Sequence, residues 1–365
     1  MTKCYYTSIE DKNLIQQSFN NIAWLIFGKK NPDKIKAFRE LFELEVKQIN
    51  IFPQGTTTTY LNNRTPGICR LDEQDEKIII EMLGYIKSNN TQHSFIKHEG
   101  SHEFCHAFAN LLPLLFSKQP DGIIKNGILC KNHMGMIKET DPTSGKLVGQ
   151  HYYGKLFNET MMDIITSMGI NTFDSSSNNP IDNILKTQYA QWGSSKTGYS
   201  IFTSLTRLTI AAFSNNGFIN YQKIVNSGYG IFDITTKMEN GESYKANDFL
   251  YGILFDPLHI EQEFDKFMGQ GYYRVFCEYL DRLFITFLEK QKIPSEEVKI
   301  VMNILPDFLN KKINYYRQHG IIDQNGANQI VGNFNQIWNS MQREYQSFFS
   351  QSDIDEIAKK AGRKQ

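Results

Sequence analysis

The chain of 365 residues is rich in apolar residues and carries no net charge. Hydrophobic residues make up 40% of it, with 26 Phe and 18 Tyr, which is ample for one large core or two smaller ones. Disorder requires low hydrophobicity and high net charge, so that class is excluded. Lys plus Arg and Asp plus Glu number 39 each, so the chain lacks the basic excess with which nucleic-acid binders displace phosphate counterions.

The first half of the chain alternates between amphipathic helices and short β-prone segments. Apolar residues recur at helical spacing after the capping-box-like segment 8–11, and again after Asn31-Pro32-Asp33. In chain order the predicted elements are a helix to residue 26, a helix from Pro32 whose apolar face continues to Val46 and Ile49, an edge strand at 55–61, a helix at 72–87, a helix at 91–116 interrupted by Pro113, a β-hairpin of 134–140 and 146–153, and a helix at 155–168 ended by Gly169.

The second half of the chain is predicted to be helical. The Ser/Asn-rich segment 174–179 has loop composition and is the best candidate for a domain boundary. Apolar residues recur at helical spacing over 199–213, 247–268, 272–292, 295–319 and 325–349. We therefore expect an α+β fold, mostly α, with a mixed region at 1–175, a helical domain at 176–350 and a polar tail at 351–365.

The cysteines and the N-terminal residues indicate a reducing compartment. Five cysteines are widely spaced and odd in number, which is not the pattern of a disulfide framework, and none form a CxxC pair. The first residues lack the apolar core of a signal peptide, and the early apolar run at 22–27 is too short to cross a bilayer. We expect a cytoplasmic protein without a membrane span and without a nucleic-acid partner.

Four of the eight histidines fall between residues 93 and 106, where two His-Glu-x-x-His motifs overlap at His102. Residues four apart on a helix lie one above the other, so two imidazoles at this spacing can bind one metal ion. The Glu after the first His then lies beside the metal and can accept a proton from water. Zinc suits such a site because it accepts imidazole and carboxylate ligands and leaves a position open for water. The alternative for a single motif is a polar helix face with its histidines in solvent.

A second element lies downstream, in the apolar helix predicted to begin near residue 155. Glu159 is placed to supply a third ligand. Asp163, one turn later on the same face, is placed to accept a hydrogen bond from the free ring nitrogen of a liganding His. The alternative is two exposed acids on an amphipathic helix, but the apolar neighbours leave few positions for solvent. The predicted zinc ligands are therefore His102, His106 and Glu159, with Glu103 as general base.

The overlapping motifs leave two registers open. A site at His98/His102, with Glu99 as base, would place Gly100 inside the active-site helix at a propensity cost of about 1 kcal/mol. The apolar residues before His98 nevertheless suit that register. We prefer His102/His106, because large and small apolar residues lie between and after these two histidines.

His-Glu-x-x-His followed by Asn-Glu-x-x-x-Asp, here within residues 98–168, resembles the active-site motifs of the gluzincin, or thermolysin-like, zinc metallopeptidases. The resemblance covers only these two helices. It implies a zincin-like catalytic domain with a small β-sheet in residues 1–175, followed by the helical domain. It also implies hydrolysis of a peptide or protein substrate. Gluzincins generally use a Tyr or His donor for the oxyanion, and Tyr199 is our candidate, with aromatic packing as the alternative.

The predicted reaction is hydrolysis by a zinc-activated water, with Glu103 accepting the proton and delivering it to the leaving amine. A peptide substrate could add as a strand along residues 56–61. Two other classes stay open, namely a non-catalytic zincin with a structural metal and a partner-binding helical half, and a helical scaffold without metal. Glu103 favours catalysis, since a protein that only binds a partner has no chemical need of this carboxylate.

Overall fold

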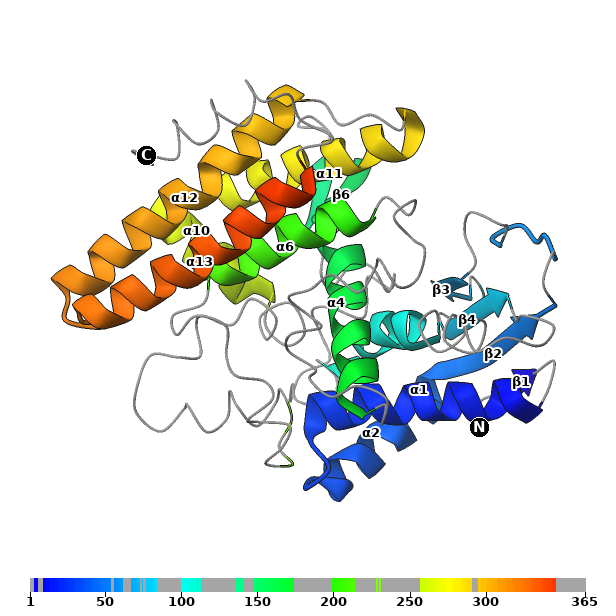
Figure 1. Ribbon diagram of the computed structural model, residues 1–365. Helices are drawn as coiled ribbons and strands as arrows, with labels where there is room; N and C mark the ends of the chain where they lie inside the picture. The colour runs from blue at the N-terminus through cyan, green and yellow to red at the C-terminus, as the bar shows by residue number, and fades with distance from the viewer. Residues whose placement is uncertain are drawn as a thin grey trace. The chain divides into compact units, whose positions relative to one another are not determined.

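The computed structural model describes residues 3–5, 9–53, 56–61, 67–72, 74, 77–83, 100–109, 111–112, 135–140, 147–173, 199–213, 228, 230, 257–290 and 295–345 (Figure 1). The chain divides into two compact units, each built from separate segments. The first comprises Met1–Asn132, Met162–Ser194 and Asn220–Lys237, and the second His133–Met161, Ser195–Ile219 and Met238–Gln365. The predicted boundary loop at 174–179 lies outside the described residues.

Two amphipathic helices, α1 (Ile9–Phe27) and α2 (Pro32–Glu45), begin the first unit. Both were predicted, and Pro32 stands in the first turn of α2, where a helix does not need the N–H that proline lacks. The ring of Phe19 on α1 makes an edge-to-face contact with Phe42 on α2, with centroids 5.0 Å apart. Such pairs bury large apolar surfaces in a favourable ring geometry, so this contact anchors the core of the unit.

A four-stranded sheet forms the rest of this core, in the order β1-β2-β4-β3. The strands β1 (Lys3–Tyr5), β2 (Val46–Phe52) and β4 (Ile78–Leu83) are parallel, and β3 (Gly67–Leu71) is antiparallel to β4. Every residue of β4 is buried. Five of its six residues are apolar, as a central strand covered on both faces requires, and the sixth is Glu81.

Two helix predictions are wrong at this sheet. The helix from Pro32 ends at Glu45, and Val46 and Ile49 lie in β2 instead. The helix predicted at 72–87 is absent from its described residues, of which 78–83 form β4. Both segments are dense in β-branched residues, which favour a pleated surface. Short apolar runs do not separate helix from strand by their period, and pairing with neighbouring strands decides between them.

The predicted edge strand at 55–61 is also wrong, because residues 56–61 form an irregular turn. The backbone N–H groups of Tyr60 and Leu61 donate to Oγ1 of Thr58 at 3.2 and 2.9 Å. A Thr hydroxyl that bonds locally to the backbone in this way competes with pairing in a sheet. The Tyr60 ring lies over the guanidinium of Arg70, 4.4 Å from ring centroid to Cζ, so the turn covers part of β3.

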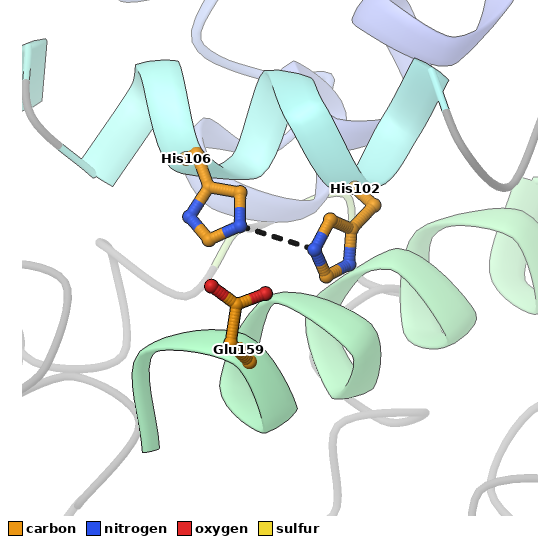
Figure 2. A group of neighbouring side chains, drawn as sticks. All are labelled: His102, His106 and Glu159. Carbon is orange, nitrogen blue, oxygen red and sulfur yellow. Dashed lines mark hydrogen bonds between the residues drawn. The ribbon is translucent and has the colours of Figure 1, made fainter. Parts of the chain in front are cut away.

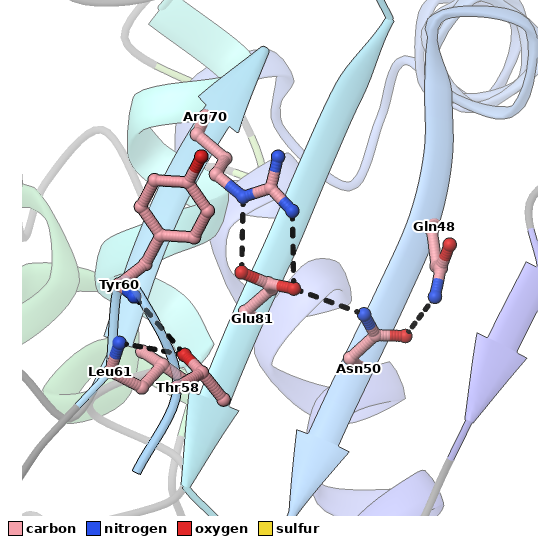
Figure 3. A network of polar contacts seen from close by, with 7 residues as sticks. All are labelled: Gln48, Asn50, Thr58, Tyr60, Leu61, Arg70 and Glu81. Atoms are coloured by element: carbon pink, nitrogen blue, oxygen red, sulfur yellow. Dashed lines mark hydrogen bonds and ion pairs between the residues drawn. The ribbon is translucent and has the colours of Figure 1, made fainter. Parts of the chain in front are cut away.

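A row of polar side chains crosses three strands of the sheet (Figure 3). Arg70 on β3 donates to both carboxylate oxygens of Glu81 on β4, at 3.0 and 3.3 Å. Asn50 on β2 donates to Glu81 at 3.3 Å and accepts from Gln48 at 2.6 Å. Glu81 and Asn50 are buried, and a buried carboxylate is tolerated only when it is paired. The row therefore stabilises this strand order and disfavours a shifted register.

The second unit contains a β-hairpin and a set of helices. The strands β5 (Gly135–Thr140) and β6 (Leu147–Tyr153) pair antiparallel, as predicted. The described helices are α6 (Tyr199–Phe213), α10 (Pro257–Met268), α11 (Tyr272–Lys290), α12 (Ser295–Gln318) and α13 (Gln324–Tyr345). In the described part of the chain after residue 198, these helices confirm the helices predicted there. The stacked rings of Phe264, Phe276 and Phe308 join α10, α11 and α12.

The helix α4 (Lys155–Phe173) is continuous, with residues 155–161 in the second unit and 162–173 in the first. We predicted that Gly169 would end this helix, but the helix runs on to Phe173. A Cβ atom at Gly169 would lie 2.7 Å from Cδ1 of Ile22 on α1. This glycine therefore serves the close approach of two helices.

In fold class the protein is α+β and mostly α, with a small mixed sheet, as predicted. Among the described residues, no helix is both long and apolar enough to cross a membrane.

Candidate metal centre

The helix at residues 100–109 is buried along its whole described length. Gly100 begins this described stretch, and a Cβ there would lie 2.7 Å from Cδ1 of Ile15 on α1. Phe104 and Phe108 both make edge-to-face contacts with Phe19, with centroids 5.9 and 5.1 Å away. One face of the helix is therefore fixed against α1. His102 and His106 are each two positions away from these rings, which places them on the opposite face.

The Nε2 atoms of His102 and His106 lie close to each other. Their Nε2 atoms are 3.0 Å apart, and the ring planes are inclined by 76° (Figure 2). Two nitrogen ligands of one tetrahedral zinc would be separated by about 3.3 Å, given the usual Zn–N bond lengths. The spacing of the two imidazoles thus fits ligation of a single ion.

Asp163 on α4 fixes the orientation of the first histidine. Its Oδ1 atom is 2.8 Å from Nδ1 of His102, and only 4% of Asp163 is exposed. A neutral His102 that donates its Nδ1–H to this carboxylate carries its lone pair on Nε2, the atom that a metal needs. The contact predicted for Asp163 is therefore present; its role behind a metal-liganding His stays a prediction, and such partners raise the basicity of a ligand.

Glu159 completes the group, one helical turn before Asp163 on α4. The possible ligand atoms of His102, His106 and Glu159 all lie within 4.8 Å of one another. Figure 2 shows the Glu159 carboxylate directed at the two imidazoles. Both histidines are buried, and Glu159 is partly exposed. Within the described part of the chain, this is the group of His, Cys, Asp and Glu side chains that could hold a metal ion. Two imidazoles and one carboxylate form a donor set that suits zinc.

Glu103, the predicted general base, is 4% exposed in the same helix. It follows His102 directly in the chain, and its role as general base stays a prediction. Cys105 is not part of the group. Burial raises the pKa of its thiol to about 12, and its Sγ lies 3.5 Å from Oγ1 of Thr166. It packs as a small core residue, as predicted.

Several predicted residues lie beyond what the structure describes. His98 and Glu99, the other register of the motif, fall outside the described residues. Tyr199 is the first residue of α6, and its side chain is outside the described set. The role of Tyr199 as an oxyanion donor therefore stays a prediction.

Sequence reasoning missed Asp281, whose carboxylate accepts hydrogen bonds from the backbone at the start of α4. The two segments are 127 residues apart at the more distant contact, so no local motif reveals the pairing. One signal was present in the sequence. Asp281 interrupts the apolar stripe formed by Cys277, Leu280 and Phe284 on α11, and an acid in an apolar stripe needs a buried partner.

No protein-family model, curated protein or solved structure matches the chain.

Proposed function

We propose that the protein is a zinc-dependent peptidase with His102, His106 and Glu159 as metal ligands. One observation carries this proposal. The Nε2 atoms of two buried histidines lie 3.0 Å apart, and Asp163 holds one of these imidazoles through its other nitrogen. A polar helix face with histidines in solvent would need neither the burial nor the carboxylate.

The chain's own residues have distinct roles in this reaction. Zinc, when bound, supplies the Lewis acidity that makes a water nucleophilic near neutral pH. Glu103 accepts the proton of the attacking water and later delivers it to the leaving amine. Asp163 keeps the His102 lone pair directed at the metal. The gluzincin resemblance of the two motifs supports this assignment, with a peptide or protein as substrate. The hypothesis of substrate addition along residues 56–61 is withdrawn, because these residues form a turn.

The test combines metal content with peptide cleavage by Glu103→Gln. This variant keeps the shape of the side chain and removes the proton acceptor. We expect it to retain zinc and to lose activity on a peptide library by roughly 10²- to 10⁴-fold, the usual contribution of a general base. Glu263→Gln is the matched control, because Glu263 is also a buried glutamate but lies on α10 in the second unit. It should keep both zinc and activity.

Two outcomes contradict the peptidase. Full activity in Glu103→Gln would remove the assigned base. Zinc bound by a wild-type protein that cleaves no peptide would identify the alternative, a non-catalytic zincin-like protein whose metal stabilises the fold. Absence of bound zinc even after addition of the metal would exclude both.

A further inference from the structure

The connection between β6 and α4 consists of one residue, Gly154. The strand ends at Tyr153 and the helix begins at Lys155. Gly154 has φ of 88°, a conformation that residues with a side chain rarely adopt. The residue before a helix normally caps it, because a Ser, Asp or Asn side chain there accepts from the first free N–H groups. Glycine cannot do so, so the residue before α4 offers no side-chain acceptor to the helix.

Asp281 on α11 supplies the missing acceptor. One carboxylate oxygen accepts from the N–H of Gly154 and the other from the N–H of Leu156, both at 2.8 Å. Asp281 is 7% exposed, so water does not readily replace it. Its negative charge also lies at the positive end of the helix dipole.

Two further contacts hold the first turns of α4. The ring of Phe157 packs against Phe276 on α11, with centroids 5.8 Å apart. The hydroxyl of Thr160 lies 2.6 Å from that of Thr206 on α6. Glu159 thus stands between two residues that are tied to α6 and α11.

We infer that Asp281 is a positioning residue for the ligand Glu159, an inference that rests on the proposed zinc site. Asp163, near the middle of α4, is held by its own contact with His102. Glu159 lies closer to the helix start, and the first turns of a helix unwind most easily when the terminal N–H groups lose their acceptors. Loss of the cap therefore releases Glu159 while the contact between Asp163 and His102 remains. The C-terminal helices contribute to the metal site in this way, without supplying a ligand.

The test compares Asp281→Asn with a matched variant, Asp265→Asn. Asp265 accepts from the N–H groups of Gly271 and Tyr273 at 2.6 and 2.8 Å, and Gly271 has φ of 76°. It caps α11 with the geometry that Asp281 uses on α4. The helix α11 carries Asp281 and Phe276 but no proposed ligand, so this variant weakens a cap without touching the cap of α4. The measurements are the zinc dissociation constant, by competition with a chelator well below the melting temperature, and the melting temperature of the metal-free protein.

We expect both substitutions to lower the melting temperature. Only Asp281→Asn should raise the zinc dissociation constant, roughly tenfold, the scale of a lost helix cap. Asp265→Asn should stay within about twofold of wild type, because it leaves the bonds from the Asp281 carboxylate to the start of α4 in place. If Asp281→Asn does not fold, Phe276→Leu loosens the same turn, and it should weaken zinc binding in the same direction.

Other outcomes separate the two proposals. Unchanged zinc affinity in Asp281→Asn, or in Phe276→Leu where that variant replaces it, would overturn the positioning role. If Glu159→Ala still abolished binding, the zinc site itself would stand. A wild-type protein that binds no zinc would overturn both.

Discussion

The imidazole of His102 and the carboxylate of Asp163 meet across two helices, with Nδ1 and Oδ1 2.8 Å apart and both side chains buried. This contact fixes the orientation of the His102 ring. It also joins the helix at 100–109 to α4, which carries Glu159. The orientation of His102 and the packing of these two helices therefore depend on the same hydrogen bond.

Replacement of Asp163 by Asn should weaken zinc binding by about 10- to 100-fold, the usual effect of losing a carboxylate behind a liganding His. The amide presents a donor or a neutral acceptor to Nδ1, so the useful tautomer of His102 is less favoured. Chelator competition measures the change. Thr166→Val is the control, since it alters α4 one turn away at the contact with Cys105 and should keep wild-type affinity. Equal affinities in all three proteins would contradict the role of Asp163.

Replacement of Glu159 by Ala should remove most of the bound zinc, because two imidazoles alone form an incomplete ligand set. Elemental analysis of protein purified without added metal measures this. We expect about one zinc per chain in wild type, since catalytic zinc sites of this kind bind a single ion. Equal zinc content in both proteins would eliminate Glu159 as a ligand and, with it, the gluzincin assignment.

Replacement of Gly169 by Ala should lower the free energy of unfolding by about 1–2 kcal/mol, as overpacking of a core does. The new Cβ would lie 2.7 Å from Cδ1 of Ile22, which is fully buried. Ile22→Val removes that atom at a cost of about 0.5–1.5 kcal/mol by itself. Urea denaturation of the double variant should show a smaller loss than the sum of the single losses. Strict additivity would mean that the two positions do not meet.

Because of the buried pair of Glu263 and Lys312, the free energy of unfolding of the second unit should pass through a minimum near neutral pH. Burial raises the pKa of Glu263 from 4.5 to about 7, against the opposing effect of Lys312. Burial lowers the pKa of Lys312 from 10.5 to about 8. The Glu263 contribution to stability is fully present below pH 4.5 and is lost as the pH rises through about 7. The Lys312 contribution is present above pH 10.5 and is lost as the pH falls through about 8.

The double variant Glu263→Gln/Lys312→Met removes both titrations. Relative to this variant, the wild type should be least stable between about pH 7 and about pH 8 and should gain stability on either side. Urea denaturation across this range measures the difference. Lys312 also donates to the carbonyls of Ala212 and Phe213 at the end of α6, and loss of these bonds adds an offset that is constant with pH. A difference without pH dependence would disprove the effect.

The sequence predicted the amphipathic elements well and the sheet poorly. The helices α1, α6 and α11 to α13 have apolar residues at an unambiguous helical period, and the β5–β6 hairpin has a turn sequence between its strands. The strands β2 and β4 were taken for helix because apolar residues in such short segments also fit a helical spacing, and their pairing partners are distant in the chain.

The residues around the candidate site likewise differ in how well the sequence predicted them. The group of His102, His106, Glu159 and Asp163 could be predicted from local spacing. The two histidines are four residues apart in one helical segment, and the two acids are four residues apart in another. Asp281 could not, since its relation to α4 is set by packing between segments that are far apart in sequence. Only its place in an apolar stripe marked it as unusual.

The cap on α4 determines how the protein can be shortened. A fragment that ended at residue 175 would contain every predicted metal ligand and the predicted general base. It would also expose the N–H groups of Gly154 and Leu156, which in the whole chain bond to Asp281. Such a fragment retains the sequence motif but loses a support of Glu159, the predicted third ligand. The support of Glu159 thus comes from α11, more than a hundred residues further along the chain.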